Sequence, residues 1–243
     1  MKDKRKTLSQ LLLPVVLAAT CLPTVLMLTS DWMLRSLASE FNSGWLNNLH
    51  FHLTGDGPPM IIFVGVLLLL AAFLCGLMLR VEGVLSLVNR MGRTDRRMME
   101  IAVLISVLYV VCGPLYSALI NLLSNGSAKL VDEEMTLTID QRTFLAAMFA
   151  AGLAGPIAEE FLFRGAVMGV FFARGWSAPM TILASSLLFV FPHVQYEPAG
   201  LIYIFLGGCG FGFLRWYSGG LFAPILAHCL INGSQIILRV MLT

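Results

Sequence analysis

Seven apolar stretches, each close to the length of a bilayer-crossing helix, constrain this chain more than any other feature. They cover residues 9–29, 60–79, 101–124, 143–172, 178–195, 199–217 and 219–242. A helix needs about 20 apolar residues to cross the hydrocarbon core, and a helix satisfies its own backbone hydrogen bonds in lipid. The stretches lack the alternating pattern of barrel strands. We therefore predict an all-α, polytopic transmembrane helix bundle of about seven spans.

The composition agrees with a lipid environment. Hydrophobic residues make up 58% of the chain and charged residues 12%, whereas soluble domains are about half apolar and a quarter charged. The expected partner is therefore the bilayer, and a net charge of +2 is too small to indicate a nucleic-acid partner. The five cysteines lie in apolar runs without a CxxC pair, which predicts small buried side chains rather than a disulfide framework or a thiolate metal site.

The distribution of basic residues predicts the orientation of the spans. Four of them precede the first stretch, which is too long for a typical signal peptide and is interpreted as a retained helix. By the positive-inside rule the N-terminus is cytoplasmic, and we expect an integral protein of the bacterial inner membrane. The eleven basic residues on the predicted cytoplasmic side are Lys2, Lys4, Arg5, Lys6, Arg80, Arg90, Arg93, Arg96, Arg97, Arg174 and Arg215.

The chain divides into two predicted regions. Region 1–142 would hold N-terminal transmembrane helices, an interfacial loop over 30–59 and a cytoplasmic amphipathic helix over 81–100, where apolar side chains alternate with arginines. Region 143–243 would form a helical core that carries the polar residues of a catalytic site.

Three charged residues stand within six positions of one apolar stretch. They are Glu159, Glu160 and Arg164, and a charge near the bilayer centre costs at least about 2.5–3.5 kcal/mol on insertion scales. Glu160 and Arg164 are four residues apart, a spacing that favours an ion pair on one helix face. Glu159 points about 100° away round the helix and has no local partner. An unpaired carboxylate in such a site is suited to accept a proton.

Polar side chains also occur in two later stretches. His193 ends the string Phe189 to His193, while His228 and Asn232 are four residues apart and share one helical face. Together with Glu159 they can bind a water or a metal, remove a proton and stabilise an oxyanion. A structural interpretation stays open, because His and Asn also hydrogen-bond between membrane helices. The Glu160 and Arg164 pair can likewise be purely structural.

At these positions the sequence resembles the CAAX protease and bacteriocin-processing family of intramembrane proteases, also called Abi. That family carries a Glu-Glu-x-x-x-Arg motif, a Phe-x-x-x-His motif and a His-x-x-x-Asn motif on successive helices. Here the three motifs are complete and in order, within about the last third of the chain. They comprise Glu159, Glu160 and Arg164, then Phe189 and His193, then His228 and Asn232.

The resemblance implies an endopeptidase related to the type II CAAX prenyl endopeptidase, acting on a membrane-associated protein or peptide. Glu159 would activate the attacking water with help from His193. His228 and Asn232 would polarise the scissile carbonyl, and Glu160 with Arg164 would shape the site. The family has been described both as metalloproteases and as glutamate-dependent proteases, so a divalent metal such as zinc stays open. Its candidate ligands are Glu159, His193, His228 and Asn232, without an HExxH signature.

Non-catalytic functions remain as alternatives. An immunity or scaffold protein that binds a peptide, or a small carrier of ions or protons, would use the same intramembrane polar residues. Carriers tend to have broken helices, and the run from Gly207 to Gly212 supplies a possible break. Our preferred interpretation of that run is close helix approach. The substrate, its prenylation, the face to which the site opens and the oligomeric state stay open.

Overall fold

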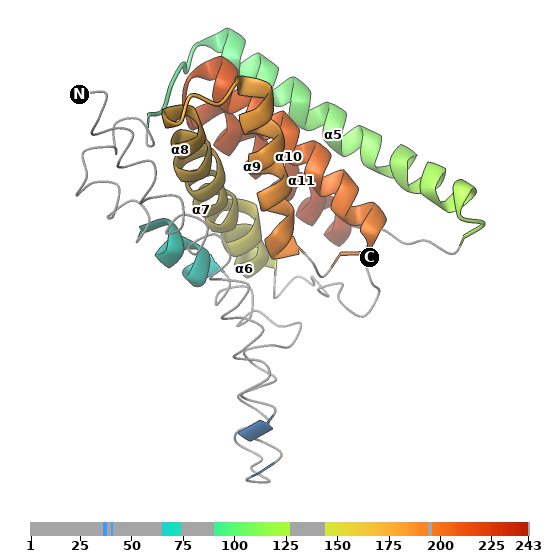
Figure 1. The fold of residues 1–243 in the computed structure, drawn as a ribbon. Helices are drawn as coiled ribbons and strands as arrows, with labels where there is room; N and C mark the ends of the chain where they lie inside the picture. The colour runs from blue at the N-terminus through green and yellow to red at the C-terminus, as the bar shows by residue number, and fades with distance from the viewer. Residues whose placement is uncertain are drawn as a thin grey trace.

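The computed structural model describes residues 36, 37, 40, 65–73, 90–126, 144–193 and 196–242. Residues 65–73 form a helix, and the segments that follow are named as in Figure 1. They are α5 (Arg96–Leu123), α6 (Phe144–Phe149), the π-helical η2 (Ala150–Ala154), α7 (Gly155–Glu160), the π-helical η3 (Phe161–Val167), α8 (Met168–Ala173), α9 (Ala178–Val190), the 3-10 turn η4 (Phe191–His193), α10 (Pro198–Ser218) and α11 (Phe222–Leu242).

Four of the described helices are long and apolar enough to cross a membrane, and a fifth is apolar but shorter. The four are Arg96–Leu123, Phe144–Ala173, Pro198–Ser218 and Phe222–Met241, and the fifth is Ala178–His193. They coincide with the last five predicted spans. The helix 65–73 lies inside the predicted span 60–79. The span 9–29 and the loop 30–59, apart from residues 36, 37 and 40, fall outside the described residues. The prediction of an all-α polytopic transmembrane bundle is confirmed.

The long helix Phe144–Ala173 is the most buried of the candidate spans. Segments α6 to α8 form one long helix, which lies on one side of the bundle, with α5 on the other and α9, α10 and α11 between them (Figure 1). Helix α11 contacts α5, α10, η2 and α7, and α9 packs along α10 and against η3 and α8. The long helix therefore faces both α9 and α11, the two helices that carry the predicted histidines.

Glycines let α10 approach its neighbours on two faces. A Cβ on Gly207 would lie 2.9 Å from the ring of Tyr109 on α5, and one on Gly208 would lie 3.1 Å from Cβ of Ser186 on α9. Helix α10 runs without interruption from Pro198 to Ser218. The glycine run therefore serves close packing, as preferred above, and is not a break in the helix.

The segment before α5 is pinned to the turn between α10 and α11. The N–H of Leu221 donates to Arg90 at 2.8 Å, that of Phe222 to Met91 at 3.1 Å, and Arg93 N–H donates to Ser218 at 2.9 Å. The amphipathic helix predicted over 81–100 is wrong for residues 90–95, which are not helical, and residues from Arg96 onward belong to α5. Residues 81–89 lie outside the described ranges.

Helix α5 begins at a capped N-terminus. Asp95 Oδ1 accepts the N–H of Met98 at 3.2 Å, and the Arg93 guanidinium donates to Asp95 Oδ2 at 2.8 Å. That hydrogen bond from Arg93 lowers the pKa of the Asp95 carboxyl below its usual value. The cap therefore stays ionised, as favoured at a helix N-terminus.

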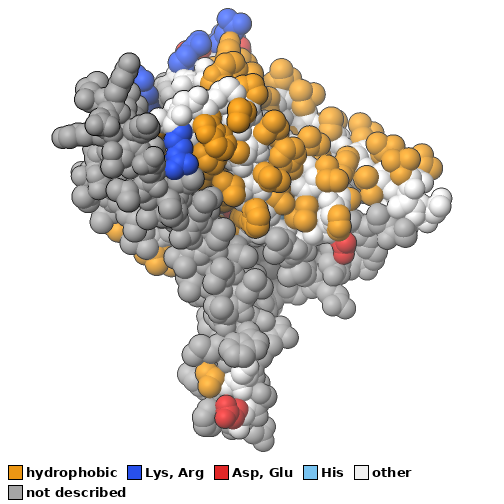
Figure 2. All heavy atoms as spheres, in the orientation of Figure 1, with side chains coloured by type: hydrophobic (Ala, Val, Ile, Leu, Met, Phe, Trp, Pro, Cys, Tyr) orange, Lys and Arg blue, Asp and Glu red, His pale blue; other side chains and the backbone are white. Residues whose placement is uncertain are grey.

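The described surface is apolar along the helices and basic towards one end. Figure 2 shows hydrophobic side chains covering the exposed flank of α5, with Arg side chains gathered where that helix begins. Only a small part of the apolar window in α5 is buried within the bundle, so its outward side chains face lipid. These exposed residues include Leu104, Leu108, Leu115, Leu119 and Leu122.

The pinned segment generates a prediction about stability. A Cβ at Gly220 would stand 2.0 Å from the backbone nitrogen of Gly92, so Gly220→Ala must displace backbone. We expect this change to lower the unfolding free energy by about 3 kcal/mol, measured by thermal unfolding in detergent micelles. Gly175→Ala is the matched control, because φ at Gly175 is +82° with open space around it, and it should cost about 1 kcal/mol. Equal losses in both variants would contradict the close contact.

Candidate active site

The centre of the site is a buried ion pair on the long helix. Glu160 Oε1 lies 3.2 Å from the outer guanidinium nitrogen Nη1 of Arg164, and neither side chain is exposed to solvent. The predicted pairing at a spacing of four residues is confirmed. This distance is within the range of an ion pair, but Nη1 of Arg164 forms no aligned hydrogen bond. Their attraction is therefore mainly electrostatic, in a region where both charges have lost their water.

Neighbouring helices hold the Arg164 guanidinium on three sides. Its other outer nitrogen, Nη2, donates to the Gly208 carbonyl of α10 at 2.9 Å. The Phe189 ring lies under the guanidinium carbon at 4.4 Å and the Phe211 ring at 5.2 Å. A cation over aromatic faces is stabilised more strongly when it is desolvated. The charge of Arg164 is thus fixed by α9 and α10 as well as by Glu160.

His228 connects the ion pair to the second glutamate. Its Nδ1 lies 2.9 Å from Glu160 Oε1, and its Nε2 lies 3.6 Å from Glu159 Oε2. A carboxylate paired with Arg164 can only accept, so Nδ1 carries the hydrogen and donates it to Glu160. In the neutral ring, Nε2 then presents a lone pair towards Glu159. The ring stacks on Phe211 at a centroid distance of 4.5 Å, which fixes its plane.

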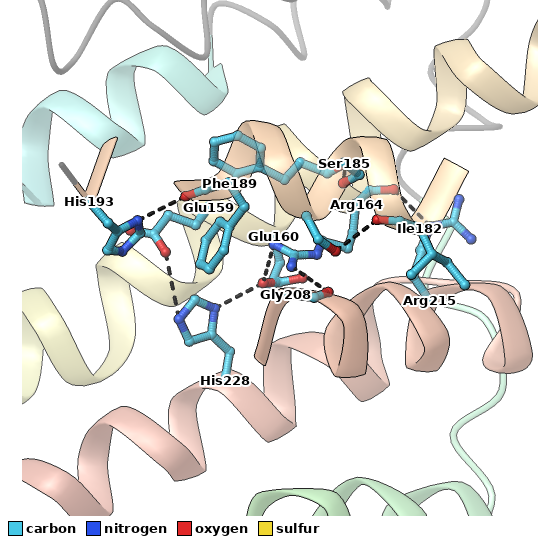
Figure 3. A network of polar contacts seen from close by, with 12 residues as sticks. Glu159, Glu160, Arg164, Ile182, Ser185, Phe189, His193, Gly208, Arg215 and His228 are labelled. Carbon is cyan, nitrogen blue, oxygen red and sulfur yellow. Dashed lines mark hydrogen bonds and ion pairs between the residues drawn. The ribbon is translucent and has the colours of Figure 1, made fainter. Parts of the chain in front are cut away.

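Glu159 lies at the accessible edge of this cluster. Its side chain is 12% exposed, whereas that of Glu160 is sealed. In Figure 3 the Glu159 carboxylate lies between the imidazole rings of His193 and His228. The structure thus separates two adjacent glutamates into a buried partner of Arg164 and a more accessible carboxylate flanked by imidazoles.

His193 stands at the end of the helix Ala178–His193. Its Nδ1 lies 2.9 Å from the Phe189 carbonyl, and because a carbonyl only accepts, Nδ1 is again the protonated nitrogen. Its Nε2 is therefore the acceptor in the neutral ring. The ring is partly exposed and lies 4.8 Å from the Phe189 ring, centroid to centroid. Both site histidines have the same tautomer, each set by a hydrogen bond at Nδ1.

Asn232 contacts the backbone of the long helix. Its Nδ2 donates to the Ala151 carbonyl at 2.9 Å. Ala151 belongs to η2, where Gly155 N–H donates to Ala150 five residues earlier. In that register the next donor, for Ala151, would be residue 156, but Pro156 has no N–H. Asn232 thus supplies the missing hydrogen bond, and the predicted shared face of His228 and Asn232 does turn towards the long helix.

The segment η3 carries Arg164 and has further side-chain donors. Ser185 Oγ donates to the Phe163 carbonyl at 3.1 Å, and Arg215 Nε donates to the Arg164 carbonyl at 3.0 Å. Arg215 is among the basic residues predicted for the cytoplasmic side, which we expected to lie in connections between spans, and for Arg215 that placement is wrong. Arg215 lies in the last turn of α10 and is 6% exposed. The length of the apolar stretch 199–217, which includes Arg215, was the signal that could have revealed it.

The donor set does not fit a protein-bound zinc site. Among the described residues, no group of three or more His, Cys, Asp or Glu side chains is arranged to hold a metal. A catalytic zinc site takes three protein ligands, and the described His and Glu side chains do not form such a set. This geometry therefore does not support a metal site, and we derive no step through a metal. The candidate ligands were Glu159, His193, His228 and Asn232.

Comparison with known proteins finds a family similarity over the segment that holds this site. Residues 141–234 match the family model described as type II CAAX prenyl endopeptidase, Rce1-like. That segment contains all the polar residues of the three motifs, so the resemblance predicted from them is confirmed. A curated Escherichia coli protein, described as an uncharacterized 24.3 kDa protein, is 41% identical over 78 residues, which are 31% of this chain and 36% of that protein. The chain thus spans little more than a third of that relative. No solved structure matches the chain.

The buried pair generates a prediction about stability. Glu160→Gln leaves the Arg164 charge sealed without a counter-ion, and we expect it to lower the unfolding free energy by about 3–5 kcal/mol. The matched control is Glu159→Gln at the neighbouring, more accessible position, which should leave the thermal midpoint nearly unchanged. Thermal unfolding of the purified variants measures both.

A double variant makes this prediction sharper. Glu160→Gln combined with Arg164→Met removes both charges, so it should regain much of the stability lost in Glu160→Gln alone. If Glu159→Gln proved the more destabilising single change, the assignment of the ion pair to Glu160 would be wrong.

Proposed function

Because residues 141–234 match the Rce1-like family, we propose that this protein is an intramembrane endopeptidase of the CAAX type. It hydrolyses a peptide bond of a membrane-associated protein or peptide with water activated by Glu159. The observation that carries the proposal is that two glutamates adjacent in sequence have different surroundings. One is sealed against Arg164, and the other lies between two imidazoles with 12% of its side chain exposed.

Water activation is the first step of the proposed reaction. Glu159 accepts a proton from the water. The Nε2 lone pair of His193 accepts a hydrogen bond from the other hydrogen of the water and so orients its oxygen. The partial exposure of both side chains is compatible with water reaching them. The oxygen attacks the scissile carbonyl carbon, and the carbonyl electron pair moves onto its oxygen.

The resulting oxyanion needs donors, and His228 and Asn232 are proposed to supply them. Asn232 has a second Nδ2 hydrogen besides the one given to Ala151. His228 can donate from Nε2 only as an imidazolium, because its Nδ1 hydrogen is directed to Glu160. Fixed donors of this kind commonly contribute about 3–4 kcal/mol each to catalysis.

Collapse of the tetrahedral intermediate completes the reaction. The proton held by Glu159 passes to the leaving nitrogen, the carbon–nitrogen bond breaks, and a carboxylic acid and an amine are released; the acid loses its proton to solvent water. Glu159 is thereby returned to its starting state. Glu160 and Arg164 stay outside the proton transfer and hold His228 through its Nδ1.

The arginine-rich end of the bundle is proposed to face the cytoplasm, with the N-terminus on the same side. The support is the excess of basic residues at that end under the positive-inside rule. We propose the bacterial inner membrane as the location. We also keep region 143–243 as the catalytic unit, since it contains all but the first two residues of the family match and all six motif residues that bear charge or polarity.

Comparative membrane proteomics tests the proposed function. Cells that carry the intact protein are compared with cells that carry Glu159→Gln, and uncut membrane peptides should accumulate only in the variant. With a peptide identified in this way, purified Glu159→Gln and His193→Ala should cleave at least about 10²-fold more slowly, as expected for loss of a general base or its partner.

Glu197→Gln is the matched control for this experiment. Glu197 is exposed immediately before α10, outside the site, and its variant should cleave at the rate of the unaltered protein. Full cleavage by purified Glu159→Gln would sink the proposal. Ion or proton flux through proteoliposomes, unchanged by loss of all cleavage, would favour the carrier instead.

A further inference from the structure

Two buried side chains outside the three motifs bind consecutive carbonyls of η3. Ser185 of α9 donates to Phe163, and Arg215 of α10 donates to Arg164 (Figure 3). Both donors come from helices other than the one they bind, and both are buried. The π-helical segment is thus fastened from two sides at neighbouring positions.

The hydrogen-bond pattern of η3 explains why the Arg164 carbonyl needs an outside donor, whereas the Phe163 carbonyl accepts from Ser185 in addition to a backbone N–H. At the end of η3 the N–H of Met168 is directed to the carbonyls of Phe163 and Gly165 and passes over that of Arg164. Such a skipped carbonyl is what a π turn produces when it rejoins an α-helix. Left buried without a donor, it would cost about 1–3 kcal/mol. The guanidinium of Arg215 removes this cost and so favours the π register over the α register.

The π register decides where the ion pair points. Glu160 directly precedes η3 and Arg164 lies within it. If the segment reverted to an α-helix, the residues on its two sides would rotate relative to each other by about 100°. The contacts of Arg164 with Glu160 and with Gly208, and of Glu160 with His228, would then not all persist.

We propose that Ser185 and Arg215 are positioning residues of this site. They hold η3 in its π register, which keeps Glu160 on Nδ1 of His228 and so aims Nε2 of His228 at Glu159. The relevance to catalysis rests on the proposed function, whereas the effect on His228 does not depend on it. Neither residue touches the accessible carboxylate, so each acts through the ion pair.

The chain offers a matched pair of variants at adjacent buried serines. Ser185 binds across to η3, whereas Ser186 donates to Ile182 within its own helix at 2.7 Å. Ser185→Ala and Ser186→Ala therefore remove the same hydroxyl group from the same helix, and only the first unpins η3. The readout is the ¹⁵N spectrum of labelled histidine in protein reconstituted in nanodiscs, with the His228 signal identified by its loss in His228→Gln. This spectrum separates imidazole nitrogens with and without a hydrogen.

The expected result is specific to Ser185 and Arg215. In spectra recorded with the imidazole neutral, His228 in the unaltered protein and in Ser186→Ala should give a single form with hydrogen on Nδ1. Ser185→Ala and Arg215→Met should convert this signal to a mixture of both tautomers, and Arg215→Lys should restore the single form in part by keeping a donor. Where a cleavage assay is in hand, Ser185→Ala should lower kcat by up to about 100-fold with little change in KM.

Two outcomes overturn the inference. One is an unchanged His228 spectrum in folded Ser185→Ala and Arg215→Met, which would reduce both residues to packing. The other is an equal change in Ser186→Ala. Neither outcome bears on whether Glu159→Gln abolishes cleavage, because the spectrum is recorded without a substrate. A failure of the proposed function therefore remains distinguishable from a failure of this inference.

Discussion

The sealed ion pair between Glu160 and Arg164 is the constraint on which the rest of the site depends. Two charges without water are costly unless other groups satisfy them, and here the aromatic rings of α9 and α10, a backbone carbonyl and an imidazole all do so. These contacts oblige α9, α10 and α11 to meet at one point of the long helix. Glu159 stays more accessible because Arg164 and the Nδ1 hydrogen of His228 are both engaged by Glu160, its neighbour in the chain.

The long helix can serve this arrangement because it departs from regular α geometry twice. Each departure frees a carbonyl, and each freed carbonyl accepts from a side chain of a neighbouring helix. Asn232 performs this function at η2 and Arg215 performs it at η3, where Ser185 adds a second donor to the neighbouring Phe163 carbonyl. The polar contacts between these membrane helices are therefore concentrated at π turns, which frequently occur at functional sites.

The sequence predicted the spans and the ion pair because both depend on local rules. Apolar length predicts a crossing helix, and a spacing of four residues brings Glu160 to Arg164. The convergence of His193 and His228 on Glu159 also followed once the three motifs were recognised. The π turns could not be predicted, since they depend on donors from distant segments such as Arg215. The 90–95 segment was also missed, because its partner is a backbone turn more than a hundred residues later.

The division of the cluster into a sealed support pair and a reactive carboxylate is the central claim. Labelling with a hydrophobic carbodiimide, which modifies carboxyl groups within membranes, tests it directly when the adducts are located by fragment mass spectrometry. The account predicts an adduct on Glu159 that grows in step with the loss of peptide cleavage, with Glu160 unmodified. An adduct on Glu160 in folded protein, or full cleavage by protein modified at Glu159, would contradict it.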